Sequence, residues 1–143
     1  MSAMPTLPPE WIDHFASGVS HRIGSCNAAR RPAICRGLAA LCDPNRRVTV
    51  YATRAAGGAV LHAIAETGWV SLVMAQPQTH RTLHLKGRDG RVESAGTDTD
   101  ALIATRRDAF VSQIEPYGFT LDQVGMAWYD IRPGDLYAVH FSI

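Results

Sequence analysis

The chain has 143 residues, the size of one ordinary domain, which is long enough to bury a single hydrophobic core. Its 46% hydrophobic and 19% charged residues are typical of a globular protein and exclude a disordered or membrane-spanning chain. The net charge of +1 gives no broad positive field for a phosphate backbone. We therefore predict one globular domain over residues 1–143, with no nucleic-acid and no membrane partner.

The compartment and the metal content are predicted from the N-terminal stretch, the cysteines and the histidines. Residues 1–10 show no basic start followed by a long apolar run, so no signal peptide is expected and the predicted location is cytoplasmic. The three cysteines are odd in number and lack metal-finger spacing, which favours reduced thiols. His80 and His84 would lie about 13 Å apart on an extended strand, too far for one ion, so no metal site is predicted.

The first half of the chain predicts an opening helix, three strands and a second helix. Trp11, Ile12 and Phe15 have helical spacing after a proline pair, and turn-forming residues separate the three β-like runs. Short links between consecutive strands indicate antiparallel pairing. The following alanine-rich segment ends at a glycine and is expected to cross over the barrel as a helix. These elements are predicted over 8–18 (helix), 19–26, 33–42 and 47–53 (strands), and 55–67 (helix).

The second half predicts a further strand pair, two helices and a final strand. Along its second strand, polar and apolar residues alternate, so Thr82, His84 and Lys86 are expected to share one face. A turn at 88–91 is expected to let this strand continue through Val92. The later segment has apolar residues at helical spacing and stops before a proline, and a capping box then indicates a short helix. These elements are predicted over 69–75 and 81–87 (strands), 97–115 and from 120 (helices), and 135–143 (strand).

This order of elements predicts an α+β fold dominated by an antiparallel β-barrel of six strands, with a crossover helix and C-terminal helices. Arg36 on the second strand and the pair Arg81-Thr82 on the fifth strand match residues of a known protein family, whose fold is a six-stranded antiparallel split β-barrel. The chain resembles the pyridoxamine 5'-phosphate oxidase-like family of FMN-binding split β-barrels over residues 19–87, and more loosely over its last helices and strand. The resemblance implies an FMN-binding domain that forms a homodimer, with Arg36 on the flavin phosphate and Arg81-Thr82 near the flavin ring.

The start of the crossover helix supplies the other predicted cofactor-binding residues. Where the family has a serine-arginine-lysine cluster, this chain has Ala56-Gly57-Gly58. A helix N-terminus presents unpaired N–H groups, and glycine lets an anion come close, so Gly57 and Gly58 are candidates for phosphate contact. Thr53 and Arg54 precede them, and a guanidinium matches phosphate geometry. Lys86, the only lysine beside thirteen arginines, is a further cofactor-binding candidate.

Two function classes are predicted, and the sequence assigns no catalytic residue, substrate or electron donor to either. The first is an FMN-dependent oxidoreductase acting on a small molecule, in which the flavin carries the redox chemistry. True pyridoxamine phosphate oxidase activity is not expected. The resemblance implies that such an enzyme carries further arginine and histidine ligands for the substrate phosphate near its C-terminus, whereas residues 130–135 offer only Arg132. The alternative is a non-catalytic split barrel that has lost FMN and binds haem, another ligand or none. In that case His140 is the residue to examine.

Overall fold

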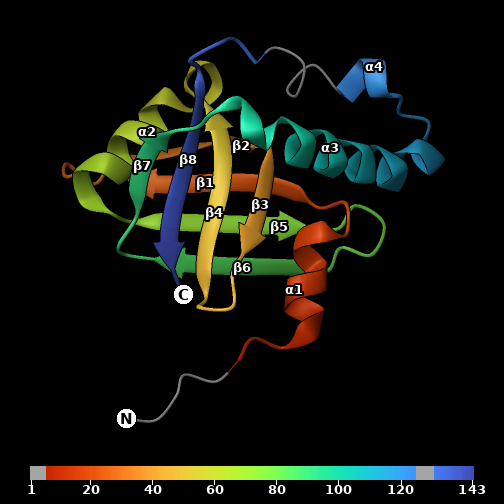
Figure 1. Ribbon diagram of the computed structural model, residues 1–143, viewed down its shortest axis with the longest axis horizontal. Helices are drawn as coiled ribbons and strands as arrows, with labels where there is room; N and C mark the ends of the chain where they lie inside the picture. Colours follow the sequence, from red (N-terminus) through yellow and green to blue (C-terminus); the bar gives the residue numbers. More distant parts are fainter. Residues whose placement is uncertain (1–5, 125–130) are drawn as a thin grey trace.

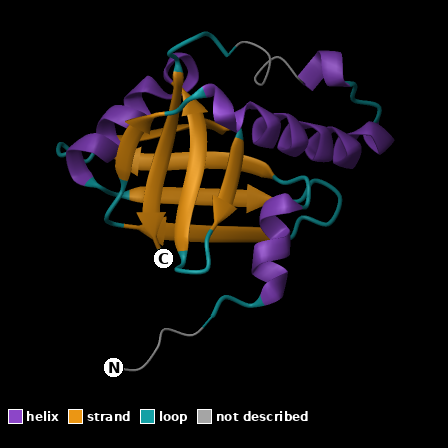
Figure 2. Ribbon diagram, in the orientation of Figure 1, coloured by secondary structure: helices purple, strands orange, loops and turns teal. Residues whose placement is uncertain are grey.

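A computed structural model describes residues 6–124 and 131–143 of the chain. Two four-stranded antiparallel sheets lie across one another, with helices around their rims (Figures 1 and 2). The predicted α+β class is confirmed, but the described part of the chain contains eight strands, so the prediction of six was wrong. The difference arises because two of the predicted strands each divide between the two sheets.

The first sheet, sheet A, has the strand order β2-β1-β5-β6. One face is apolar and faces the core: along β1, His21 and Ile23 are buried whereas Arg22 and Gly24 are half-buried. On β6, Leu85 is buried and Thr82, His84 and Lys86 are exposed, which confirms the predicted alternation. The strands are β1 (Ser20–Cys26), β2 (Pro32–Gly37), β5 (Val70–Ala75) and β6 (Thr82–Gly87).

The second sheet, sheet B, has the order β3-β4-β8-β7 and is the nearer sheet in Figure 1. Its central strand β4 is almost entirely buried, since both of its faces are covered. The final strand β8 pairs along its whole length with β4, which brings the C-terminus beside the middle of the chain. The strands are β3 (Ala39–Cys42), β4 (Arg47–Thr53), β7 (Arg91–Ser94) and β8 (Leu136–Ser142).

Glycines mark the two places where the chain passes from sheet A to sheet B. At Gly37, a Cβ atom would lie only 3.2 Å from Cγ2 of Val50 on β4, so the absence of a side chain lets the two sheets come close here. The predicted strand 33–42 therefore bends at this point and becomes β2 and β3. At Gly87, a Cβ would lie 2.5 Å from Cδ2 of Phe141. The expected continuation of that strand through Val92 is likewise wrong, because β7 pairs with β8 in the other sheet.

The predicted helices are all present in the described residues. Thr120 and Gln123 form the predicted capping box, with each backbone N–H bonded to the other's side chain. The 3-10 turn Thr97–Thr99 precedes the long helix, which is therefore shorter than predicted. The helices are α1 (Pro9–Ala16), α2 (Arg54–Thr67), α3 (Asp100–Ile114) and α4 (Leu121–Val124). No helix in the described ranges is long and apolar enough to cross a membrane.

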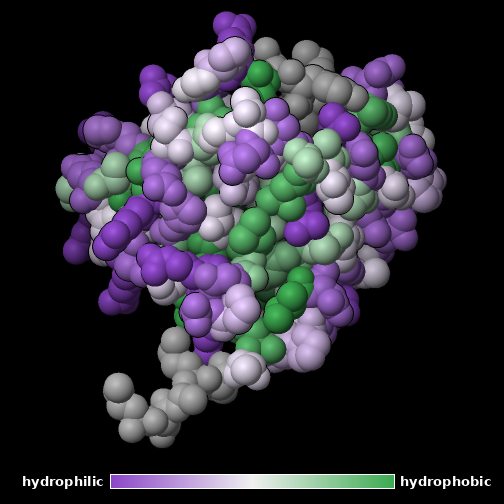
Figure 3. Space-filling model, viewed as in Figure 1, coloured by the Kyte–Doolittle hydropathy of each residue, from purple (hydrophilic) through white to green (hydrophobic). Residues whose placement is uncertain are grey.

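Two hydrophobic clusters hold these layers together. The larger lies between the sheets and against α2, and the smaller joins the outer face of sheet B to α3. Figure 3 shows the side of the molecule formed by sheet B, where a hydrophobic band runs between hydrophilic side chains. Helix α3 covers part of the outer face of sheet B. The outer face of sheet A lies on the far side of that view.

Candidate functional site

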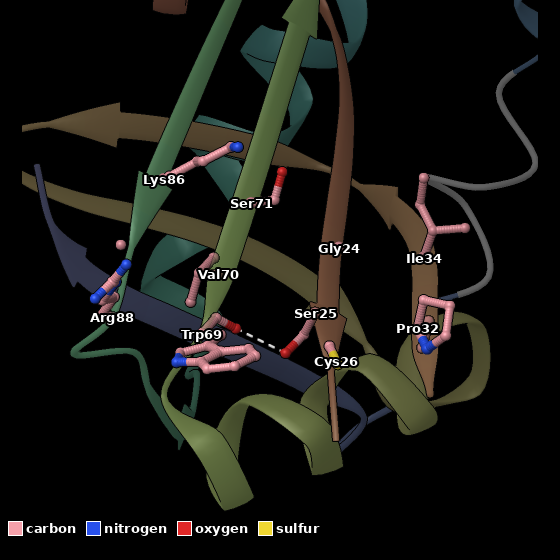
Figure 4. A pocket seen from close by; sticks show the side chains of 12 residues that line it. Gly24, Ser25, Cys26, Pro32, Ile34, Trp69, Val70, Ser71, Lys86 and Arg88 are labelled. Carbon is pink, nitrogen blue, oxygen red and sulfur yellow. Dashed lines mark hydrogen bonds between the residues drawn. The ribbon is translucent and has the colours of Figure 1, made fainter. Parts of the chain in front are cut away.

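The outer face of sheet A carries a groove of about 790 Å³, a volume in the usual range for ligand sites. Its floor is low because Gly24 and Ser71, which are cross-strand neighbours, have little or no side chain. Ile34 borders the floor on β2 and Lys86 on β6, since these residues pair with Gly24 and Ser71 respectively. Figure 4 shows Lys86 extending over the neighbouring strand toward Ser71. The groove thus runs across the strands, open to solvent along its length.

The lower end of the groove in Figure 4 is formed by Trp69, just before β5. Hydrogen bonds fix its backbone: Ser25 Oγ donates to its carbonyl at 2.7 Å, and its N–H donates to Thr67 Oγ1 at 3.3 Å. Trp69 nevertheless remains 48% exposed, and Ile34 across the groove is 71% exposed. Large apolar side chains that are open to solvent along one groove are typical of a ligand or partner surface.

Two arginines face each other beside this groove. Arg22 and Arg36 are direct cross-strand neighbours on β1 and β2, two residues along each strand from the pair Gly24 and Ile34. Burial lowers the pKa of Arg36, and the positive charge of Arg22 lowers it further. Like charges at opposed positions repel one another, and an anion bound between them would offset that repulsion. The geometry therefore suits Arg36 as the predicted phosphate ligand, with Arg22 beside it.

The N-terminus of α2 is occupied by the protein's own groups. Thr53 caps it by accepting a hydrogen bond from Ala56 N–H at 3.3 Å, and Asp135 accepts one from Ala55 N–H through its carboxylate, also at 3.3 Å. The Arg54 guanidinium donates to the hydroxyl of Tyr137 and lies 5.0 Å from the centre of that ring. Thr53 and Arg54 therefore serve the helix start and strand β8 in this structure.

The two glycines of the predicted phosphate site differ in their surroundings. A Cβ atom on Gly57 would lie 2.6 Å from the sulfur of Cys35, whereas a Cβ on Gly58 would meet only Arg54 Cγ, at 3.8 Å. Gly57 is buried and Gly58 half-buried. Packing against β2 thus accounts for glycine at 57, and this packing places the start of α2 beside the strand that carries Arg36.

Gly57→Ala is expected to lower the free energy of unfolding by about 1–3 kcal/mol, because the added methyl group overpacks against Cys35. Thermal or denaturant unfolding measures this, and Gly58→Ala is the matched control with a smaller expected loss. Adding Cys35→Ala to Gly57→Ala should restore part of the stability by removing the clashing sulfur. A Gly57→Ala protein as stable as wild type would contradict the packing explanation.

Arg81 and Thr82 lie at a different corner of sheet A. They line a smaller hollow of about 210 Å³ together with Trp11 and His14 of α1. Thr82 is on the same exposed face as Lys86, but four residues from it along β6. Arg36 is on β2, at the other edge of the sheet. One protomer therefore does not bring the predicted phosphate and ring residues together.

His140 is held on both sides of its ring. Nδ1 is 2.8 Å from Thr49 Oγ1, and Nε2 is 2.6 Å from Glu93 Oε1. An axial iron ligand needs an accessible ring nitrogen, so this arrangement does not present His140 to a haem. On the groove side of the molecule, His84 contacts Ser71 through Nε2 at 2.7 Å. Within the described ranges, no group of three or more histidine, cysteine or acidic residues could hold a metal ion.

Arg22, Gly24, Ser71, Trp69 and Arg88 were missed by the sequence analysis. The six-residue loop 27–32 between the predicted first two strands was a usable signal, because a closed hairpin over that loop pairs Arg22 with Arg36. No comparable local signal connects Trp69 with Gly24. Their proximity depends on the pairing of β1 with β5, which are separated by three strands and a helix in the sequence.

Two crossed antiparallel sheets with a crossover helix and a groove on one outer face define the class of split-barrel proteins to which pyridoxamine 5'-phosphate oxidase-like FMN-binding proteins belong. The resemblance predicted from the sequence is confirmed at the level of the fold. No protein-family model and no curated protein sequence matches the chain.

Solved structures with this fold are very distant in sequence. HupZ of Group A Streptococcus has a TM-score of 0.57 at 6% identity, covering 96% of this chain and 90% of its own. An F420 reductase has a TM-score of 0.54 at 13% identity, covering 95% and 94%. A pyridoxamine 5'-phosphate oxidase-related, FMN binding protein of Nostoc punctiforme has a TM-score of 0.52 at 14% identity, covering 95% and 81%. These likenesses establish the fold, and function has to be argued from the site.

Proposed function

We propose that this protein binds FMN on the outer face of sheet A and acts as a flavin-dependent oxidoreductase on a small molecule. The observation that carries the proposal is the Arg22–Arg36 pair beside an open groove with a glycine-serine floor. Paired guanidiniums match the oxygens of a phosphate. The adjoining groove offers apolar borders at Ile34 and Trp69 for a planar ring system.

The spacing of these residues suits a ligand with a phosphate at one end and a ring at the other. Arg36 lies one strand and two residues from Gly24, about 8 Å by ordinary strand geometry. A ribityl chain can span such a distance. The N–H groups of α2 contribute less than expected from the sequence, because Thr53 and Asp135 already accept hydrogen bonds from its first turn. The phosphate is therefore assigned to the arginine pair.

A homodimer follows from the position of Arg81 and Thr82. If these residues contact the flavin ring, as the family resemblance implies, they act on the flavin of a second copy, because Arg36 lies at the opposite edge of the sheet. The exposed Ile34 on the edge strand β2 would then be covered by the partner. Two-fold pairing is the commonest closed assembly and gives two equal sites. A strictly monomeric FMN-loaded protein in light scattering would contradict this.

The bound flavin supplies hydride or electron transfer, and the protein supplies its surroundings. Arg22 and Arg36 hold the phosphate by charge-assisted hydrogen bonds. The Ser71 hydroxyl, already 2.7 Å from His84 Nε2, is the polar group at the groove floor and would orient a ring by hydrogen bonding. The apolar borders exclude water from one side of the ring. No acid or base from this chain is required for these roles.

A second candidate is a binding protein on the same fold that does not retain FMN. The observation that favours it is the carboxylate of Asp135 at the start of α2, where it takes the place of an anion and repels a phosphate. Haem is a possible ligand of such a protein, as predicted from the sequence. The engagement of both His140 nitrogens means that another group would have to bind the iron.

An absorption spectrum of the purified protein, followed by titration of the apoprotein with FMN, tests the proposal. We expect the two visible bands of oxidised flavin, or their restoration on adding FMN, and at least about tenfold weaker binding of riboflavin, which lacks the phosphate. NADH or NADPH consumption by the loaded protein then tests the reductase activity. A colourless protein that ignores FMN but shifts the haemin spectrum would instead support the second candidate.

A further inference from the structure

The groove has a cationic end that the assigned flavin phosphate does not use. Lys86 lies on β6, and Arg88 follows that strand directly. None of the residues that line the groove carries a carboxylate, so these two charges face the groove without an acidic neighbour among its lining residues. Two cations at one end of an open groove indicate a ligand group of negative charge.

The far corner of this end, at Arg88, is distant from the arginine pair. Arg88 lies two strands and four residues from Arg22, the nearer arginine, about 16 Å by ordinary strand geometry. Lys86 lies between them, about 12 Å from Arg22 on the same basis. A phosphate held between Arg22 and Arg36 therefore leaves Arg88 for a second anionic group, on the same or another molecule.

The aromatic side chain beside these cations narrows the ligand chemistry. Trp69 is 48% exposed, its backbone is fixed by Ser25 and Thr67, and it lies between Arg88 and the hairpin end of β1 in Figure 4. The backbone of Gly68, which directly precedes Trp69, is also fixed, because its carbonyl accepts a hydrogen bond from Gly90 N–H at 2.8 Å. An indole face and adjacent cations together suit a planar ring bearing a negative charge.

We propose that Lys86, Arg88 and Trp69 form a subsite for a small planar aromatic anion, in which the cations bind a phosphate or carboxylate and the indole stacks on the ring. The statement that the bound compound is the substrate, which exchanges electrons with the flavin, rests on the proposed flavin function. The statement that these three residues form a binding site rests only on the groove. It gives the single lysine of the chain a role in substrate selection.

Isothermal titration calorimetry with phenyl phosphate, in the absence of FMN, tests the subsite. We expect one saturable site per chain, and about tenfold weaker binding for each of Lys86→Gln and Arg88→Gln. Benzyl alcohol and inorganic phosphate, which each lack one recognition element, should bind more weakly than phenyl phosphate. Arg91→Gln, an exposed arginine on sheet B, is the matched control with unchanged binding. Thermal unfolding of each variant checks that these exposed substitutions leave the fold intact.

The outcomes separate this subsite from the flavin proposal. Failure of wild-type protein to bind phenyl phosphate at millimolar concentration overturns the subsite, as does equal binding by wild type, Lys86→Gln and Arg88→Gln. An equal loss of FMN affinity in both variants also overturns it, because the groove would then hold one shared anion site. A protein that binds phenyl phosphate at these residues but never binds FMN refutes the flavin function and leaves the subsite standing.

Discussion

Arg36→Gln is expected to weaken FMN binding by about ten- to a hundredfold, which corresponds to the loss of one charge-assisted hydrogen bond of about 1.5–3 kcal/mol. The reason is the position of Arg36 opposite Arg22, which places two guanidiniums side by side where one phosphate can contact both. Fluorescence quenching of FMN during titration of the apoprotein measures the affinity. Riboflavin affinity should change little, because riboflavin has no phosphate to lose.

The arginine pair also provides a stability signature. Arg36→Gln should reduce both the affinity for FMN and the stabilisation of the fold that is gained from FMN. Arg91→Gln removes an exposed arginine from the other sheet and should change neither quantity. Equal FMN affinity in Arg36→Gln and wild type would place the phosphate elsewhere, with the start of α2 the next position to test.

His21→Leu is expected to raise the free energy of unfolding by about 1–2 kcal/mol at pH 7. His21 is 2% exposed, and neither ring nitrogen has a hydrogen-bond partner among the described residues. An unsatisfied buried polar group costs folding free energy, and leucine fills a similar volume without that cost. Urea unfolding of wild type and variant measures the difference, and His62→Gln, at an exposed position of α2, should change stability little.

The same substitution should change the pH dependence of stability. Burial lowers the pKa of His21 from 6.5 to about 3, with further lowering by Arg106, Arg36, His14 and Arg22. Between these values the unfolded chain binds a proton and the folded chain does not. Stability that is present above pH 6.5 is therefore lost as the pH falls, by about 2 kcal/mol at pH 5. The advantage of His21→Leu should widen accordingly, and parallel pH profiles would show that His21 is not the responsible group.

Much of the fold could be predicted because local patterns report local structure. The alternation of Thr82, His84 and Lys86 with apolar residues defined a strand with one exposed face, and the structure confirms it. Thr120 and Gln123 predicted a capped helix start, which needs only residues three apart. The number of strands was wrong, because a strand that bends at Gly37 into a second sheet has the same alternating pattern as a straight one.

The candidate site was only partly predictable. Arg36 was named from the family resemblance and Lys86 as the single lysine of the chain, and both lie on the outer face of sheet A. The role of Gly57 was interpreted from its position at a helix start, whereas the structure shows the sulfur of Cys35 occupying the space beside it. Asp135 could not be foreseen at the start of α2, since it lies 80 residues from Ala55 in the sequence.

The sequence by itself therefore determined the order and type of the elements and which side chains of each strand face outward, because hydrophobic periodicity and turn residues act over a few positions. Only the tertiary structure decided which outward faces meet. The pairing of β1 with both β2 and β5 brings Arg22 beside Arg36 and places the Gly24–Ser71 floor next to Trp69. Such long-range pairing depends on how whole sheets bury their apolar faces against each other, and no short pattern in the chain encodes it.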